Sequence, residues 1–146
     1  MRASARLAAP LAIALVAGGC GGGGGTGVHK ALSDPVAVRA AVAGFATAFG
    51  AGDGAKSCDL LTPAARAAFV KRVQKLVRST DCATAMKRLH DDAGAQVTSA
   101  FTTAQVGAVK VAGTIATVEL TAAGHSTTVH LVKQGGDWKL AGLPGA

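Results

Sequence analysis

The sequence has few of the residues that most often carry enzyme chemistry or stack against ligands. Its 146 residues include no Tyr, one Trp, four Phe, four His and three Cys. Acidic side chains are also scarce, with 8 Asp and Glu against 15 Lys and Arg, for a formal net charge of +7. This length supports one domain and excludes a multi-domain enzyme. Without several long apolar runs, a polytopic membrane protein is excluded as well.

The first nineteen residues are expected to be a signal peptide. Two arginines precede an apolar stretch at 7–17, which is too short to cross a hydrocarbon core of about 30 Å. The sequence Val-Ala-Gly-Gly-Cys at 16–20 resembles the lipobox of bacterial lipoproteins, although Ala17 stands where that motif usually has Leu. The resemblance implies cleavage before Cys20 and lipid attachment to its sulfur. The alternative is an ordinary secretory signal in which Cys20 has no role.

Residues 20–33 are expected to form a lipidated, glycine-rich tether. The glycines at 21–25 have no side chains with which to pack, and about 13 residues of such coil span roughly 20 Å. Two or three acyl chains are enough for stable anchoring in a bilayer. The sequence therefore predicts a protein anchored by lipid to the extracytoplasmic face of the cell membrane.

Cys58 and Cys82 are expected to form a disulfide. They remain as a pair once Cys20 is lipidated, and an even number of cysteines in an exported chain is typical of disulfides. A zinc site would need two further ligands, and neither Cys-x-x-Cys nor His-x-x-x-His spacing occurs. A catalytic thiol would need a histidine, and only His90 lies close in the sequence. We expect no metal and no cofactor.

Helical periodicity is expected over about 34–93. Asp34-Pro35 and Thr62-Pro63 each combine a capping residue with a proline suited to the first turn of a helix. Apolar residues then recur at helical spacing, and Gly94 is expected to end the last helix. The expected helices begin at Asp34, Asp53, Thr62 and Asp81, and the third is expected to end at about Val77.

Alternating apolar and polar residues replace the helical pattern over about 104–143. The expected strands are 106–111, 115–122, 127–134 and 137–143, with glycine-containing turns between the later ones. Helices followed by consecutive antiparallel strands predict an α+β fold, with the helices packed on one face of a sheet of about four strands.

This arrangement resembles the NTF2-like (cystatin-like) superfamily, in which helices and a curved sheet form a cone. The resemblance lies in AVAGFATAFGAGD at 41–53, CDLLT at 58–62 and VHLVKQGGDWKL at 129–140. It implies one NTF2-like domain at 34–146 without specifying a function, because both enzymes and passive binders use this fold. It also implies a pocket between helices and sheet for a small apolar ligand. The candidate lining residues are Phe45, Phe49, Phe69 and Trp138.

Three residues are candidates for acid–base chemistry of the isomerase or dehydratase type. Glu119 follows Val118 in a strand pattern and is expected to point away from the core. His130 is expected at the surface or in a structural role. His90 and Asp91 are consecutive helix residues and are not expected to face a common substrate. We therefore favour a non-catalytic binding or accessory domain with no catalytic residue assigned, and an enzyme is the alternative.

A basic surface is expected on the helix at 64–78. No acid occurs between Leu60 and Thr80. Phe69, Val73, Leu76 and Val77 are expected to form the buried face of this helix. The surface is either an ordinary solvated face or a contact for anionic lipid or an acidic protein. Nucleic acid is not expected as a partner, because no aromatics alternate with the cations. The basic residues are Arg66, Lys71, Arg72, Lys75 and Arg78.

The face of the expected sheet that the helices leave uncovered is a candidate homodimer interface.

Overall fold

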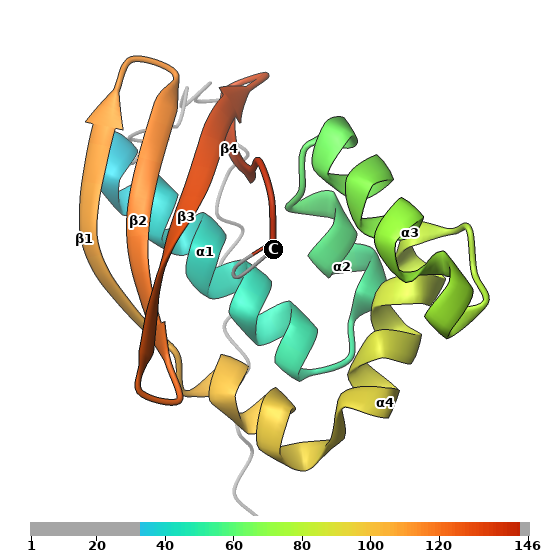
Figure 1. The fold of residues 1–146 in the computed structure, drawn as a ribbon. Coiled ribbons are helices and arrows are strands. Elements are labelled where there is room, and N and C mark those ends of the chain that lie inside the picture. Colours follow the sequence, from blue (N-terminus) through green and yellow to red (C-terminus); the bar gives the residue numbers. More distant parts are fainter. Residues whose placement is uncertain (1–32, 144–146) are drawn as a thin grey trace, which may run out of the picture. The chain divides into compact units, whose positions relative to one another are not determined.

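The structure is a computed structural model that describes residues 33–143. Within this range four helices precede a four-stranded antiparallel sheet (Figure 1), which confirms the predicted α+β class. The predicted signal peptide, lipid attachment at Cys20 and tether up to residue 32 lie outside the described residues. The helices are α1 (Asp34–Gly50), α2 (Gly54–Asp59), α3 (Pro63–Val77) and α4 (Cys82–Thr102), and the strands are β1 (Gln105–Ala112), β2 (Ile115–Ala122), β3 (His125–Gln134) and β4 (Asp137–Leu140).

Polar side chains fix the starts of two of the long helices. Thr62 Oγ1 accepts a hydrogen bond from Ala65 N at 3.1 Å to begin α3, and Asp81 Oδ1 accepts one from Thr84 N at 2.8 Å to begin α4. The prediction that Asp34 caps α1 was wrong. Ser33 occupies the cap position without a side-chain bond, and Asp34 instead contacts residues of the sheet.

The sheet is a meander in the order β1-β2-β3-β4. Val118 pairs with Val129 and Leu131 pairs with Leu140, so buried residues of neighbouring strands meet on one face. Two strand limits differ from the prediction by more than one residue. β3 begins earlier, at His125, and β4 ends at Leu140, after which the chain turns away as the segment 141–143.

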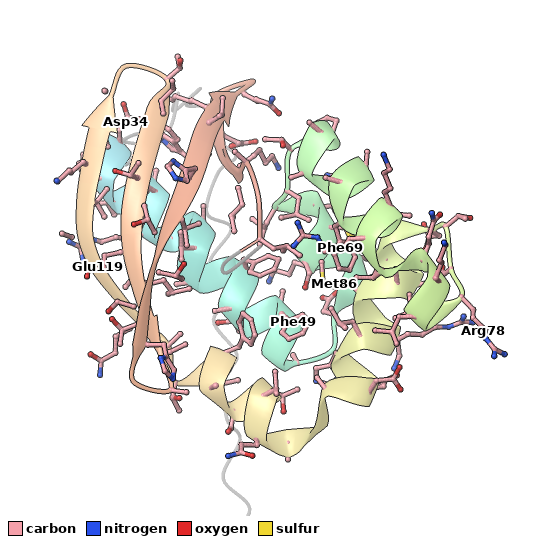
Figure 2. The ribbon with its side chains drawn as sticks, viewed as in Figure 1. Asp34, Phe49, Phe69, Arg78, Met86 and Glu119 are labelled. Carbon is pink, nitrogen blue, oxygen red and sulfur yellow. A yellow bond between two sulfur atoms is a disulfide. The ribbon has the colours of Figure 1, made fainter. Side chains whose placement is uncertain are left out.

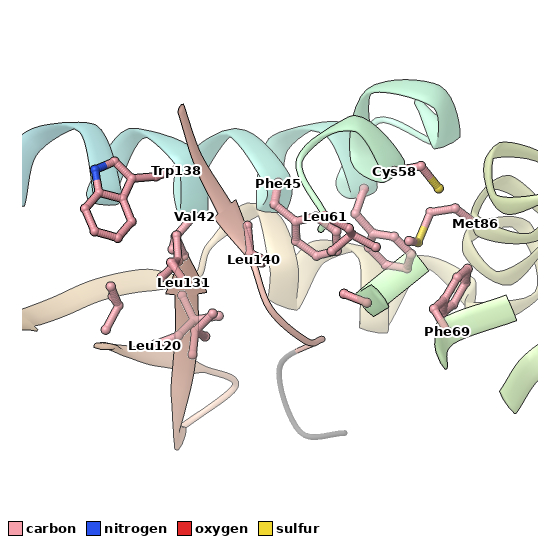
Figure 3. Close-up of a cluster of buried hydrophobic side chains, with 14 of the residues drawn as sticks. Val42, Phe45, Cys58, Leu61, Phe69, Met86, Leu120, Leu131, Trp138 and Leu140 are labelled. Atoms are coloured by element: carbon pink, nitrogen blue, oxygen red, sulfur yellow. The ribbon is translucent and has the colours of Figure 1, made fainter. Parts of the chain in front are cut away.

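Helix α1 covers the inner face of the sheet and fills the space beneath it. Val42 and Phe45 point from α1 towards Leu131 and Leu140 (Figure 3), and all four side chains are buried. The inner face of β2 adds Leu120 to the same cluster. Burying each large aliphatic side chain contributes about 2 kcal/mol, so this contact is the main support of the sheet.

The helical half is joined to the sheet and closed by a disulfide. Leu140 N donates to Leu60 O at 2.8 Å, and Thr62 N donates to Leu140 O at 2.9 Å, so the α2–α3 connection covers the edge of β4. Cys58 and Cys82 are bonded, with their Cα atoms 6.1 Å apart, and connect α2 to the first residue of α4. The predicted disulfide is therefore confirmed.

Gly94 ends the first helical part of α4, as predicted, but an unpredicted second helical part follows it. Gly94 has a left-handed φ of 74° within α4 and forms a kink, after which the helix resumes and continues to Thr102. Glycine adopts this conformation without the steric cost that a Cβ atom would bring. Phe101 in the second part of α4 then packs on Phe49, with the ring centroids 4.7 Å apart. Gly94 therefore redirects the helix towards α1.

Leu76 does not belong to the buried face of α3. Its side chain is 71% exposed, whereas Phe69, Val73 and Val77 are buried. Leu76 is three positions after Val73 and lies at the edge of that face near the end of α3, where its side chain is left uncovered. The predicted buried face was wrong at this residue.

Candidate apolar binding site

Two neighbouring hollows lie where α1, α3 and α4 face the chain segment 141–143. The first, here called the alanine lobe, has a volume of about 320 Å³. The second, here called the phenylalanine lobe, has a volume of about 210 Å³. Leu143 lines both lobes. The alanine lobe is lined by Ala64, Ala65, Ala68, Phe69, Arg72, Ala141, Gly142 and Leu143, and the phenylalanine lobe by Phe45, Phe49, Met86, Leu89, Ala93, Val97, Phe101 and Leu143.

The location of these lobes corrects the predicted pocket. A pocket was expected between the helices and the sheet, but side chains such as Val42 and Leu131 fill the space between α1 and the sheet. The lobes lie beside that packed layer, among the helices. Figure 2 shows Phe49, Phe69 and Met86 around the region that the segment 141–143 enters.

Small side chains keep the alanine lobe open. Ala64, Ala65 and Ala68 occupy neighbouring positions on α3, and Gly142 faces them from the C-terminal segment. None of these residues has an atom beyond Cβ to fill the space, while buried Phe69 supplies a large apolar wall. The lobe therefore follows from the alanine-rich sequence at 64–68.

Aromatic rings form the phenylalanine lobe. The Phe49 ring lies 6.3 Å from the Phe45 ring and 4.7 Å from the Phe101 ring, measured between centroids. Such separations are typical of favourable aromatic pairs. Val97 is 44% exposed on the second part of α4 and is the most open apolar member of this wall.

Arg72 is the one charged residue among those that line the two lobes. Its side chain is exposed, and it has no hydrogen-bond or ion-pair partner among residues 33–143. No carboxylate and no imidazole joins it in either lining. Apolar pockets with few polar groups are typical of small-molecule sites, so the lining suits an apolar ligand more than acid–base chemistry.

Three of the four predicted lining residues border the lobes, and Trp138 does not. Phe45 and Phe49 line one lobe, and Phe69 lines the other. The Trp138 ring is buried at the start of α1, where its Nε1 donates to Asp34 Oδ1 at 3.1 Å. A second donor, Lys133 Nζ, lies 2.6 Å from the same oxygen. These hydrogen bonds, first from Lys133 and then from Trp138, lower the pKa of Asp34.

The acid–base candidates lie outside both lobes. Glu119 and His130 are exposed on the outer face of the sheet, as the alternation predicted. His90 Nε2 contacts Gly50 O at 3.2 Å, and His90 Nδ1 contacts Asp91 Oδ1 at 3.2 Å. Although these two neighbours are not expected to face a common substrate, their side chains contact each other. His90 thereby joins α4 to the end of α1.

The predicted basic surface separates into two parts. Arg66 Nη2 lies 3.4 Å from Asp59 Oδ1, and this pairing reduces its contribution to a free cationic surface. The other four cations are exposed and have no ion pair within the described part of the chain. We call these four residues the basic face of α3. They are Lys71, Arg72, Lys75 and Arg78.

Sequence reasoning missed most of the pocket lining. Met86 and Leu89 stand three residues apart, a helical spacing that marks an apolar side of the first part of α4 without indicating a pocket. Val97 and Phe101 stand four residues apart, the spacing of neighbours on one helix face, and this signal marks the second part of α4. Nothing in the local sequence signals the position of Leu143, because it depends on where the chain goes after β4.

Within residues 33–143, no cluster of three or more His, Cys, Asp or Glu side chains is placed to hold a metal ion. The helices of this region are too short or too polar to cross a membrane. No protein-family model, curated protein or solved structure matches the chain significantly.

Proposed function

We propose that this protein is a lipid-anchored extracytoplasmic lipoprotein whose NTF2-like domain binds a small apolar ligand without catalysing a reaction. One observation carries the ligand part of the proposal. The two lobes, which share Leu143 in their linings, are lined by apolar side chains, and Arg72 is the single charged residue of those linings. Apolar ligands gain about 25 cal/mol for each Å² of surface that such a site removes from water.

The assignment to the NTF2-like superfamily is supported by the order and packing of the elements. Helices precede an antiparallel meander, and α1 covers one face of that sheet. The enzyme interpretation would require Glu119, His90 or His130 in the pocket. All three lie outside the lobes, so a passive binder is the better proposal.

The anchoring part of the proposal is supported by the sequence alone. A short apolar stretch, a lipobox-like Val-Ala-Gly-Gly-Cys and a glycine-rich segment follow one another at 7–27. We expect the full chain, expressed in a bacterium that processes lipoproteins, to carry diacylglycerol on Cys20. Mass spectrometry of the membrane-extracted protein tests this. The Cys20→Ala variant should leave the membrane fraction, and its retention there would contradict the anchor.

Ligand binding is tested by filling the alanine lobe. Residues 31–146 form one compact unit that contains the whole described core, and this unit is titrated with the neutral apolar fluorophore N-phenyl-1-naphthylamine. Ala68→Phe places a ring in the lobe and should weaken probe binding about fivefold or more, the effect of losing roughly 1 kcal/mol of contact. Ala43→Phe is the matched control on an exposed position of α1. Equal affinity for both variants, or no binding by the folded wild type, would reject the proposal.

A further inference from the structure

The second part of α3 combines free positive charge with an exposed apolar side chain. Arg72 and Lys75 are exposed, and Leu76, one turn after Arg72 on the same side of the helix, is 71% exposed. Leu76 is the most exposed of the large hydrophobic residues in the described chain. Basic residues around an exposed leucine are typical of helices that lie in a membrane interface.

The acidic residues nearest in the sequence do not neutralise the cations of this surface. The nearest acids in the sequence are Asp59 and Asp81. Asp59 is paired with Arg66, and Asp81 holds the first turn of α4 through Thr84 N. At the end of α3, Arg88 Nη1 donates to Val77 O at 2.8 Å and to Arg78 O at 2.9 Å. This guanidinium offsets the partial negative charge of the helix C-terminus.

Arg72 connects the basic face to the ligand site. It belongs to the basic face and also lines the alanine lobe. Ala64 and Ala68, which line the same lobe, are exposed on the same helix. Whatever surface contacts the basic face therefore lies close to the opening of the alanine lobe.

We infer that the basic face of α3, together with Leu76, binds the surface of an anionic lipid bilayer. The cations contact phosphate-bearing headgroups, and Leu76 inserts into the apolar region just below them. This contact goes beyond apolar ligand binding, because it needs no ligand in the lobes. It orients the domain with the alanine lobe opening towards the lipid, which a flexible tether alone does not do.

Vesicle sedimentation of residues 31–146 tests the charge requirement. We expect binding to vesicles of phosphatidylcholine mixed with phosphatidylglycerol, weaker binding as salt rises, and little binding to pure phosphatidylcholine. Each cation near such a surface contributes a factor of about five. Replacing all four cations of the basic face by Gln should therefore weaken binding at least about tenfold. Equal binding to both vesicle types would overturn the inference.

A control variant with the same change in net charge distinguishes binding through the basic face from general attraction between the positively charged domain and the anionic vesicle. Its four exposed cations lie on other elements and are also replaced by Gln. If this control loses as much affinity as the α3 variant, only net charge matters and the inference fails. The control residues are Arg39, Lys56, Lys87 and Lys110.

The apolar contact is tested by single substitutions. Leu76→Ala should weaken vesicle binding about threefold or more, because the buried methyl groups are lost. Val36→Ala is the matched control at another exposed apolar position of a helix, and should leave binding unchanged. If the two substitutions weaken binding equally, Leu76 does not take part in the contact. Salt-sensitive binding to polyglutamate, with none to the anionic vesicles, would assign the surface to an acidic protein and overturn the inference.

Discussion

Lys133 Nζ lies 2.6 Å from Asp34 Oδ1 and joins the first residue of α1 to β3, although the two residues are 99 positions apart in the chain. Trp138 Nε1 on β4 donates to the same oxygen at 3.1 Å. The Lys133 ammonium also lies 5.7 Å from the Trp138 ring centroid. One carboxylate thus holds the start of the domain against its last hairpin.

Replacing Asp34 by Asn should destabilise the domain in a pH-dependent way. The hydrogen bonds from Lys133 and then Trp138 lower the folded-state pKa of Asp34 below its ordinary value of 3.8. The resulting stabilisation is complete above the unfolded-state pKa and is lost as pH falls through the folded-state pKa. The difference in Tm between wild type and Asp34→Asn should therefore be largest near pH 7 and shrink below pH 3.8.

Thermal unfolding followed by circular dichroism at a series of pH values measures this difference. Asp92→Asn is the control, because Asp92 is exposed and has no ion pair among residues 33–143. It should leave Tm nearly unchanged at neutral pH. A Tm difference between wild type and Asp34→Asn that stays constant down to strongly acidic pH would contradict the role of the carboxylate.

Loss of the disulfide should lower the free energy of unfolding substantially. Cys58 and Cys82 are separated by 24 positions, and closing a loop of this length stabilises the folded state by about 3 kcal/mol. Urea unfolding of Cys58→Ala/Cys82→Ala in residues 31–146 measures the loss. Reduction should lower the stability of the wild type by a similar amount and leave the double variant unchanged. An effect of the reductant on the double variant would show another cause.

Two Gly→Ala substitutions on helices should have opposite effects. A Cβ atom at Gly54 would lie 2.1 Å from Ala83 O, where α2 meets α4. Overpacking of this kind costs about 2 kcal/mol, and backbone atoms cannot easily move aside. At Gly44 the nearest atom is Leu60 Cδ1 at 3.6 Å, an ordinary contact, so Ala should stabilise α1 by about 0.5–1 kcal/mol. Urea unfolding should rank Gly44→Ala above wild type and Gly54→Ala below it.

Shortening one side chain on each face of the sheet should show that the face towards α1 contributes much more to stability than the outer face. Leu131 is fully buried against α1, whereas Ile115 is 55% exposed. Leu131→Ala should cost about 2–5 kcal/mol, because it leaves a cavity beneath the sheet. Ile115→Ala should cost much less, about 0.5 kcal/mol. Equal losses in chemical denaturation would show that another surface covers Ile115.

Local sequence signals predicted the elements but not every place where they meet. Proline after a capping residue marked the start of α3, and alternation placed Val118 inside and Glu119 outside, since both depend on neighbours in the chain. The helical break at Gly94 was recognisable from the sequence, but the second helical part, up to Thr102, was not predicted.

The candidate site was predicted in part for the same reason. Phe45, Phe49 and Phe69 belong to periodic helix faces and were recognisable as apolar wall residues. Leu143 and Trp138 are placed by tertiary contacts. Trp138 is held at the start of α1 by Asp34, away from the lobes, and this hydrogen bond has no local signature.

The packing of α1 beneath the sheet has a consequence for the order of folding. Val42 and Phe45 lie near the start of the domain, and their partners Leu131 and Leu140 are among its last described residues. Contacts so distant in sequence form late, because a long loop must close first. The disulfide-linked segment from α2 to α4 is local and can form early. During synthesis, the part of the apolar face of α1 that contacts the sheet therefore stays uncovered until the final strands are available.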